Sequence, residues 1–253
     1  MKRFPATSCL LFLASPLIAA NFSNLDFERW IPSEPIPGDP YNRYPASRAI
    51  PRWTPGTQNA SDIPVLINER GLNAAGVSVY TLVGYPAGSI PPASVVLQGE
   101  RSAYLQAGVE LPDGPLVSSS LWQSGTVPDG MQSLEFLVGA DHSAFTVSIN
   151  GVLGQVTQLG EPTEPTRNPA IRYALDLQGM AGREIELKFT VGFDPGEVVG
   201  GMVLDELSFS PNQVPEPEMI ALIGVGVGFL GLVLSRGRNG NSTEPHSLKR
   251  GRP

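Results

Sequence analysis

The amino-acid sequence predicts an all-β protein, a jelly-roll-like β-sandwich followed by a single C-terminal transmembrane helix. The chain of 253 residues contains 25 prolines and 28 glycines, which favour many turns and few long helices. Short runs of alternating apolar and polar residues fill its middle part, and one long apolar run lies near its C-terminal end. Roughly 190 residues between the terminal segments are enough for one domain with a single core. We therefore place the sandwich at residues 21–213.

The N-terminal residues have the pattern of a secretory signal peptide. Lys2 and Arg3 precede a short apolar run, which ends in the small residues Ala19 and Ala20. This order is typical of signal peptides, so residues 1–20 are predicted to be removed. The single cysteine of the chain, Cys9, lies in this segment. The mature chain is therefore expected to have neither a disulfide nor a reactive thiol.

Alternation of apolar and polar residues marks the clearest strand. Phe145, Val147 and Ile149 alternate with polar residues in the run 143–150, and Asn150-Gly151 follows at once. Asn-Gly predicts a tight hairpin here, because both central residues of a type I′ turn need positive φ.

Residues 184–191 alternate in the same way, with Glu184, Glu186 and Lys188 expected on the outward face. Further strands are predicted at residues 25–30, 102–107, 117–122, 133–140 and 203–210. The residues expected in the core are Phe145, Val147, Ile149, Ile185, Leu187, Phe189 and Leu207, together with Trp122.

Residues 31–64 hold eight prolines and predict a long ordered loop or linker rather than a pair of strands. Four aromatic residues lie in this loop or beside it: Trp30, Tyr41, Tyr44 and Trp53. Their rings allow two interpretations. Either they pin the loop onto the sandwich, or they form an exposed platform on which sugar rings stack.

The charge of the chain between its terminal segments is strongly negative. Residues 21–218 contain 23 Asp and Glu against 10 Lys and Arg, a net charge of −13. Such a surface repels nucleic acid, which excludes that class of partner, and it leaves room for cation binding. Four acids, Asp26, Glu28, Asp205 and Glu206, lie on the expected first and last strands. If these strands are neighbours, the acids predict a structural calcium site; otherwise they are spread over a solvent edge.

Residues for catalysis are sparse in the sequence. His246 lies near the C-terminus, and His142 is flanked by Asp141 and Ser143. Three neighbours in sequence do not form a triad by adjacency, so we interpret His142 as a solvated turn residue. The His and Cys residues are too few to form a metal site. A carboxylate pair for glycoside hydrolysis has no specific candidate among the acidic residues. The sequence therefore favours a protein that is not an enzyme.

The apolar run near the C-terminus predicts a membrane span. Residues 219–234 are all apolar or glycine, and as a helix they would extend about 24 Å, against a bilayer core of about 30 Å. Arg236 and Arg238 follow, which places the C-terminal side in the cytoplasm by the positive-inside rule. Residues 239–253 are expected to form a disordered basic tail.

The order of motifs at this end resembles the PEP-CTERM sorting signal of Gram-negative bacteria. The signal is carried by residues 214–238: Val214, Pro215, Glu216 and Pro217, then the apolar run, then Arg236 and Arg238. The body is similar to small jelly-roll proteins that carry this tail, through NLDFE, AIPRWTP, RSAYLQ, SLWQSGTVP, FTVSINGV and VLDELSFS. The resemblance implies export, insertion by the tail and processing near Pro-Glu-Pro by an exosortase, a membrane cysteine transpeptidase. Family members usually end soon after the arginines, whereas this chain continues to residue 253.

Three functions remain open at this point. The first is a non-catalytic cell-surface or extracellular-matrix protein, sorted by an exosortase, anchored in the inner membrane and then released from it. The second is a carbohydrate-binding module with a structural calcium, directed at an extracellular polysaccharide. The third is a glycoside-active enzyme.

Overall fold

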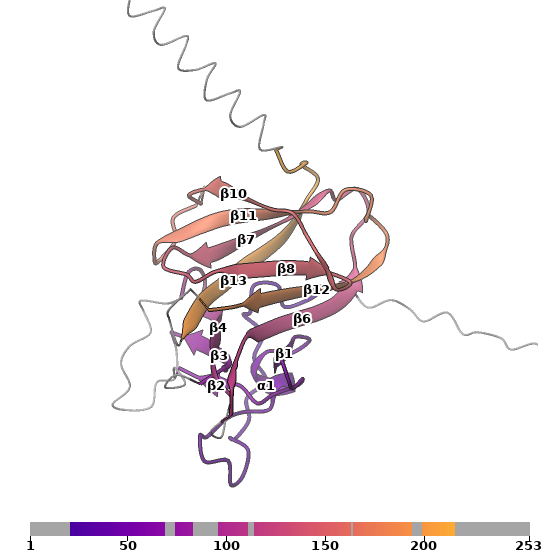
Figure 1. Ribbon diagram of the computed structural model, residues 1–253. Helices are drawn as coiled ribbons and strands as arrows, with labels where there is room; N and C mark the ends of the chain where they lie inside the picture. Colours follow the sequence, from indigo (N-terminus) through magenta and orange to yellow (C-terminus); the bar gives the residue numbers. More distant parts are fainter. Residues whose placement is uncertain are drawn as a thin grey trace, which may run out of the picture.

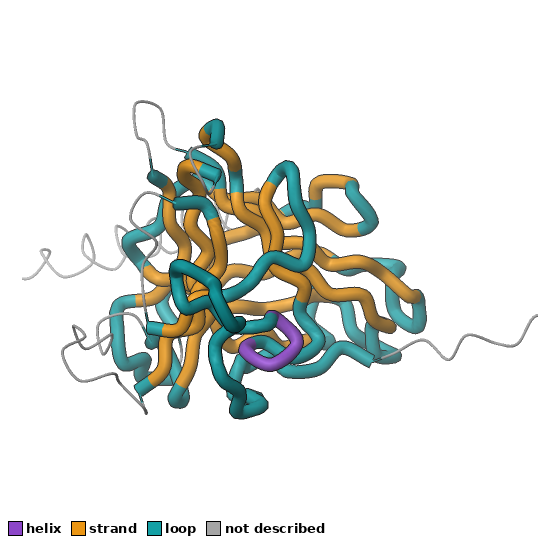
Figure 2. Tube along the Cα trace, turned by 90° about the horizontal axis from the view of Figure 1, so that it is seen from below, coloured by secondary structure: helices purple, strands orange, loops and turns teal. Residues whose placement is uncertain are grey.

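The computed structural model describes residues 21–68, 74–82, 96–110, 114–162, 164–193 and 199–215. Strands dominate these ranges, and their helical content is one four-residue helix (Figure 1, Figure 2). The elements are α1 (Ala46–Ala49), β1 (Thr54–Thr57), β2 (Leu66–Ile67), β3 (Gly76–Thr81), β4 (Arg101–Val109), β5 (Leu116–Val117), β6 (Ser119–Thr126), β7 (Ser133–Gly139), β8 (Phe145–Ile149), β9 (Val152–Leu153), β10 (Val156–Gly160), β11 (Ala170–Asp176), β12 (Glu184–Val191) and β13 (Gly200–Ser210).

The strands form two sheets, as expected for a sandwich. The five-stranded sheet has the order β1-β6-β12-β8-β9, and the larger sheet the order β10-β11-β7-β13-β4-β3-β2, with β5 paired to β4. Apart from the short β2–β3 pair, the strands pair antiparallel. The all-β class and the sandwich arrangement predicted from the sequence are confirmed.

The main core lies between the two sheets. β12 runs through the middle of the five-stranded sheet, with β6 on one side and β8 on the other. The Phe189 ring packs against Phe136 of the opposite sheet, with the ring centroids 5.2 Å apart. The predicted core residues Val147, Ile149, Ile185, Leu187, Phe189 and Leu207 are buried, and Phe145 is half-buried against them. The alternation of apolar and polar residues in β8 and β12 therefore predicted correctly which face of each strand meets the core.

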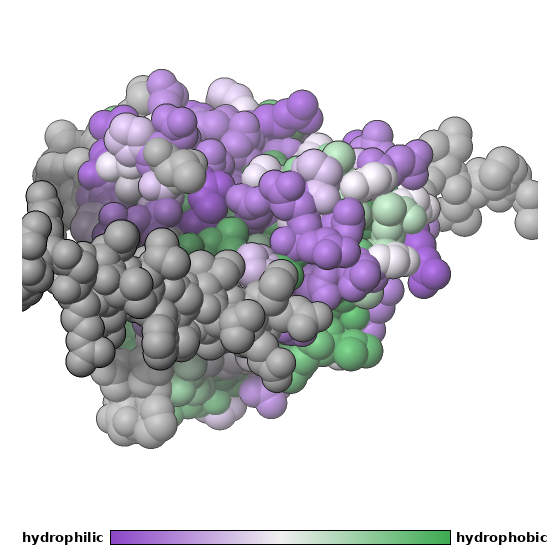
Figure 3. All heavy atoms as spheres, turned by 90° about the horizontal axis from the view of Figure 1, so that it is seen from above, coloured by the Kyte–Doolittle hydropathy of each residue, from purple (hydrophilic) through white to green (hydrophobic). Residues whose placement is uncertain are grey.

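The predicted hairpin after β8 is present. Asn150 and Gly151 have φ angles of 51° and 77°, and they connect β8 to β9. Both residues of β9, Val152 and Leu153, are 71% exposed. Seen from above, most of the visible described surface is hydrophilic, with hydrophobic atoms mainly toward one side (Figure 3).

β13 contains a bulge that the sequence did not reveal. The strand shifts register between Asp205 and Ser208, and Glu206 adopts a φ angle of 48°. Leu204 and Leu207, three positions apart, consequently both reach the core. A regular strand would place two such residues on opposite faces.

The outer faces of the two sheets differ. A second apolar cluster covers part of the larger sheet and includes Tyr80, Val96, Leu97, Tyr104, Leu137 and Val203. The segment 96–100 contributes to this cover, since Val96 and Leu97 are buried. In the part of the chain that the structure describes, no helix lies over β8, β12 and β6, whose broad faces are turned toward the viewer in Figure 1.

Two predicted elements differ from the structure. Residues 25–30 form a turn and loop instead of a strand, because Asn24 and Phe27 have φ angles of 54° and 56°. The proline-rich stretch is shorter than predicted, since Thr54–Thr57 forms β1 at the edge of the five-stranded sheet. Pro55 is tolerated there because an edge strand has one side without ladder hydrogen bonds.

The predicted signal peptide and the predicted membrane helix at 219–234 lie outside the described residues. Within the described ranges, no helix is long and apolar enough to cross a membrane.

Candidate functional site

The outer face of the five-stranded sheet carries a tryptophan that we expected in the core. Trp122 lies on β6, opposite Thr54 of β1 on one side and Lys188 of β12 on the other. Its side chain is half-buried because the indole leans over Gly56, where a Cβ atom would stand 2.6 Å from two ring atoms. The core prediction for Trp122 is wrong, and the neighbouring Leu121 faces the core instead.

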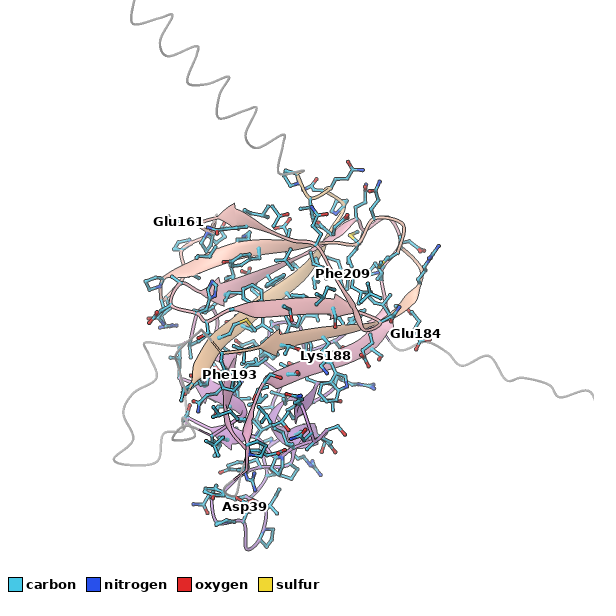
Figure 4. The ribbon with its side chains drawn as sticks, viewed as in Figure 1. Asp39, Glu161, Glu184, Lys188, Phe193 and Phe209 are labelled. Atoms are coloured by element: carbon cyan, nitrogen blue, oxygen red, sulfur yellow. The ribbon has the colours of Figure 1, made fainter. Side chains whose placement is uncertain are left out.

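Lys188 extends over the same indole. Its Nζ lies 5.0 Å from the centroid of the Trp122 ring, within the range of a cation–π contact. The ion pairs found among the described residues do not involve Lys188. Figure 4 shows Lys188 midway along β12, with Glu184 at one end of the strand. The ammonium therefore has the ring as its partner, not a carboxylate.

Hydroxyl groups surround this pair on the same face. Ser120 Oγ of β6 and Thr190 Oγ1 of β12 are 3.0 Å apart. Ser124 and Thr146 are exposed, and Ser148 is half-buried; cross-strand pairing puts all three on the face of Trp122. Alternate residues of a strand point to the same face, and Ser120 and Ser124 flank Trp122 at two-residue spacing. The sequence alone could therefore have placed these hydroxyls on the same face as Trp122.

The loop at residues 36–43 is held by one aspartate. Asp39 accepts hydrogen bonds from Arg43 Nε at 3.0 Å and Nη2 at 2.8 Å, and from the main-chain N–H of Tyr41 at 2.9 Å. The Arg43 guanidinium is the main reason that the pKa of Asp39 is lowered. Tyr41 is 39% exposed, and Arg43 Cζ lies 5.3 Å from its ring centroid. These contacts hold Asp39, Tyr41 and Arg43 together.

The four predicted platform aromatics do not form one surface. Trp53 is 3% exposed, and its Nε1 donates to the main-chain oxygen of Asn24 at 2.8 Å. Trp30 and Tyr44 are half-buried and meet edge to face, with ring centroids 6.2 Å apart. Trp53 therefore pins the loop to the core, and Tyr41 is the most exposed of the four rings.

The four acids predicted to hold calcium are each engaged by hydrogen-bond donors. Asp26 accepts from the main-chain N–H of Glu28, and Glu28 accepts from the main-chain N–H groups of Glu100 and Arg101. Glu206 lies 3.5 Å from Arg172 Nη2. In the part of the chain that the structure describes, no group of three or more acidic, His or Cys side chains is placed to hold a metal ion.

Asp205, the fourth of these acids, is 2% exposed on the outer face of the larger sheet. Its carboxylate accepts hydrogen bonds from Ser102 Oγ and from the main-chain N–H groups of Gln98 and Glu206. Burial nevertheless raises the pKa of Asp205 to about 7, and the negative charge of Glu28 adds to the rise. Asp205 and Glu206 thus have different partners, Ser102 and Arg172.

His142 is packed among aromatic rings, so its interpretation as a solvated turn residue is wrong. Its Nε2 lies 2.9 Å from Tyr173 Oη and its Nδ1 3.0 Å from the main-chain oxygen of Ser143. The imidazole meets Phe145 edge to face at 5.2 Å. Ser143 Oγ accepts a hydrogen bond from the main-chain N–H of Gly201 instead. The arrangement is that of a packing histidine, not of a nucleophile and its base.

Two glutamates line a surface cavity of about 340 Å³ at the β10–β11 connection. Glu161 and Glu164 are its acidic residues, and Pro162, Pro165 and Pro169 supply much of the rest; Figure 4 marks Glu161 at the end of β10. Both glutamates lie on one exposed connection. This placement is ordinary for solvated charge, and we assign the cavity no chemistry.

The predicted sorting motif begins just after the last strand. β13 ends at Ser210, and the linker is held by Gln132 Nε2, which donates to the main-chain oxygen of Pro211, and by Ser133 Oγ, which donates to that of Asn212. Val214 and Pro215 follow as irregular chain. The remaining motif residues, Glu216, Pro217, Arg236 and Arg238, lie outside the described residues.

The described residues thus belong to the class of all-β sandwich proteins. No protein-family model matches the chain, and no curated protein matches it either. Among solved structures, the chain is similar to TmCBM61 in complex with β-1,4-galactotriose, at 14% identity over 62% of this chain and 87% of that one, with a TM-score of 0.34.

Two further solved structures are similar at the same level. One is the K2 cleaved adhesin domain of Lys-gingipain, at 13% identity over 64% of this chain and 91% of that one, with a TM-score of 0.35. The other is the enzymatically active domain of tailspike protein 4 of bacteriophage CBA120, at 15% identity over 63% of this chain and a TM-score of 0.32. The chain spans only 19% of that tailspike structure. Likeness at these TM-scores carries no conclusion on function.

Proposed function

We propose that this chain is an exported, non-catalytic protein of the cell surface or extracellular matrix, sorted by an exosortase through its Pro-Glu-Pro motif. Residues 219–234 hold the chain in the inner membrane until processing, with Arg236 and Arg238 on the cytoplasmic side. The sandwich, which we assign to the jelly-roll type, is then the working part of the mature protein. Its role is binding.

The completeness of the sandwich before the motif supports this proposal. β13 is an interior strand of the larger sheet, paired with β4 and β7, and it ends at Ser210, before Val214. In Figure 1 the linker leaves at the top of the molecule, and the loop that contains Asp39 lies at the bottom (Figure 4). Processing after Val214 would therefore remove no strand, and before processing the loop that contains Asp39 would lie at the end of the domain opposite the linker.

The test replaces Pro215, Glu216 and Pro217 with alanines. Export and insertion depend on hydrophobicity and on the arginines, so both should persist, while release should stop. The variant should accumulate in the inner membrane at its unprocessed size, as measured by fractionation and immunoblotting.

The matched control replaces Pro211, Asn212 and Gln213 with alanines, which changes the same linker just outside the motif. The control should be processed and released like the unaltered protein. Release and shortening of the Pro215, Glu216 and Pro217 variant would contradict the sorting proposal and leave the segment as a plain anchor.

Carbohydrate binding by the sandwich is a second candidate function. The observation that favours it is the half-buried Trp122 ring on a sheet face that also bears hydroxyl and charged side chains. An aromatic ring with convergent polar groups is the usual composition of a sugar site. An extracellular polysaccharide is the partner that this candidate implies. The test is retention of the exported protein in gels that contain soluble polysaccharides.

A further inference from the structure

We propose that the outer face of the five-stranded sheet around Trp122 binds a neutral polysaccharide. We call this surface the Trp122 face and define it by Gly56, Ser120, Trp122, Glu186, Lys188 and Thr190. The inference rests on the candidate carbohydrate-binding function. It places the site on β6 and β12 instead of on the predicted platform of Trp30, Tyr41, Tyr44 and Trp53.

The indole supplies the apolar contact that a sugar ring needs. Gly56 lets one part of the ring lie directly against β1, because any Cβ atom there would meet the ring at 2.6 Å. A half-buried indole among polar side chains is a favourable surface for the C–H face of a pyranose. Lys188 now lies over this ring at 5.0 Å. Its long flexible stem can move aside, and its ammonium can then donate to sugar hydroxyls.

The hydroxyl side chains match the polar groups of a sugar. Ser120 is 2% exposed and Thr190 is half-buried, so their 3.0 Å contact forms a fixed polar floor beside the ring. A hydroxyl side chain both donates and accepts hydrogen bonds, and so does each hydroxyl of a sugar. Ser124 and Thr146 extend the same chemistry across the face, and both are exposed.

The negative charge on the outward face of β12 and in the surrounding domain favours a neutral ligand. Glu184 and Glu186 share the outward face of β12 with Lys188, so this strand offers two negative charges against one positive charge. The surrounding domain is acidic as well, with a net charge of −13 over residues 21–218. An anionic polymer would be repelled by this field, whereas a neutral polyol can use the carboxylates as acceptors and the ammonium as a donor. Glu184, Glu186, Lys188 and Thr190 follow one another along β12 on this face, which suits a polymer better than a single sugar.

The test measures binding of the full-length protein, purified in a mild detergent, to soluble neutral glucans, galactans and mannans, with polyuronates as the anionic comparison. Affinity gel electrophoresis gives the dissociation constants. We expect at least one neutral polymer to bind. Trp122→Ala should weaken that binding by about tenfold or more, as expected for an aromatic anchor, and Trp122→Phe should weaken it less.

Tyr41→Ala is the matched control, since Tyr41 is an exposed ring on the loop at residues 36–43. It should bind like the unaltered protein. Thr190→Val keeps the shape of the side chain and removes its hydroxyl, so it should weaken binding by about threefold to tenfold. The melting temperature shows whether each variant is folded. If Trp122→Ala fails to fold, Thr190→Val still tests the site.

The outcomes separate the two levels of the proposal. Unchanged affinity in folded Trp122→Ala or Thr190→Val, or loss of affinity in Tyr41→Ala, would place the site elsewhere and overturn this inference while carbohydrate binding stands. Binding of polyuronates alone would overturn the neutral class of ligand. If no polysaccharide is retained, carbohydrate binding itself fails together with this site, and the sorting proposal is still decided by the processing experiment.

Discussion

Ser102 donates its hydroxyl hydrogen to Asp205 Oδ2 at 2.6 Å, on the buried outer face of the larger sheet. The same Ser102 Oγ accepts a hydrogen bond from the main-chain N–H of Leu97, and the N–H of Gln98 donates to Asp205. One serine and one carboxylate therefore hold the segment 96–100 against the sheet. Because the carboxyl is buried, its protonation is coupled to folding.

The stability of the protein should fall as pH rises from about 4 to about 7. The pKa of Asp205 is about 7 in the folded state, against its ordinary value of 3.8. Over this interval the folded state holds a proton that the unfolded state has lost, so the free energy of unfolding decreases with pH. A difference of about three pKa units corresponds to at most about 4 kcal/mol. Chemical denaturation at a series of pH values measures this slope.

Asp205→Asn tests whether Asp205 causes this fall in the free energy of unfolding with pH. An amide does not titrate, so the pH dependence between about 4 and 7 should flatten, although the amide also loses part of the hydrogen bonding and lowers stability at every pH. A slope as steep as that of the unaltered protein would show that another group is responsible.

Phe189→Ala should lower the free energy of unfolding by about 3–5 kcal/mol, because it leaves a cavity in the core. Phe189 is fully buried and contacts both Phe136 and Trp53. Glu184→Ala on the same strand is exposed and should cost less than about 0.5 kcal/mol. Equal losses in the two variants, measured by urea denaturation, would contradict the assignment of faces in β12.

Gly56→Ala should destabilise the domain by about 1–3 kcal/mol through overpacking. The new methyl group would stand 2.6 Å from the main-chain oxygen of Ala60 and from the Trp122 ring. Gly76→Ala on β3 is the control, since a Cβ atom there meets nothing within 4 Å. Thermal unfolding followed by tryptophan fluorescence compares the two. A melting temperature of Gly56→Ala equal to that of Gly76→Ala would rule out the close packing.

Asn24 should be important for the N-terminal turn, for two separable reasons. Its Oδ1 accepts from the main-chain N–H of Arg29 at 2.8 Å, and its Nδ2 donates to the oxygen of Pro51 at 3.2 Å. Its φ angle of 54° is also unfavourable for most residues. Asn24→Ala should therefore cost about 2 kcal/mol or more in urea denaturation.

Asn24→Gly separates these reasons, because glycine tolerates the φ angle but makes neither side-chain bond. Its loss should be smaller than that of Asn24→Ala. Identical losses in both variants would show that the hydrogen bonds alone matter.

Local sequence patterns were enough to predict β8 and β12 and their faces, whereas β10 and β11 were not predicted. In residues 184–191 the apolar residues occupy every second position, and a strand turns such residues to one face whatever it pairs with. Asn150-Gly151 likewise predicted the hairpin, because positive φ is a property of those two residues. The mostly strand and loop composition followed from the many prolines and glycines.

The tertiary structure alone decided which acids and rings come together. The bulge at Glu206 sends Asp205 into a buried hydrogen-bond network and Glu206 toward Arg172, and a bulge depends on the pairing of both neighbouring strands. Residues 25–30 alternate like a strand but fold as a turn, since Phe27 gains full burial against Trp53. Alternation divides a strand into two faces, yet which of them meets the opposite sheet is set by long-range packing. For this reason Trp122 lies outside the core, over Gly56, on the face proposed to bind polysaccharide.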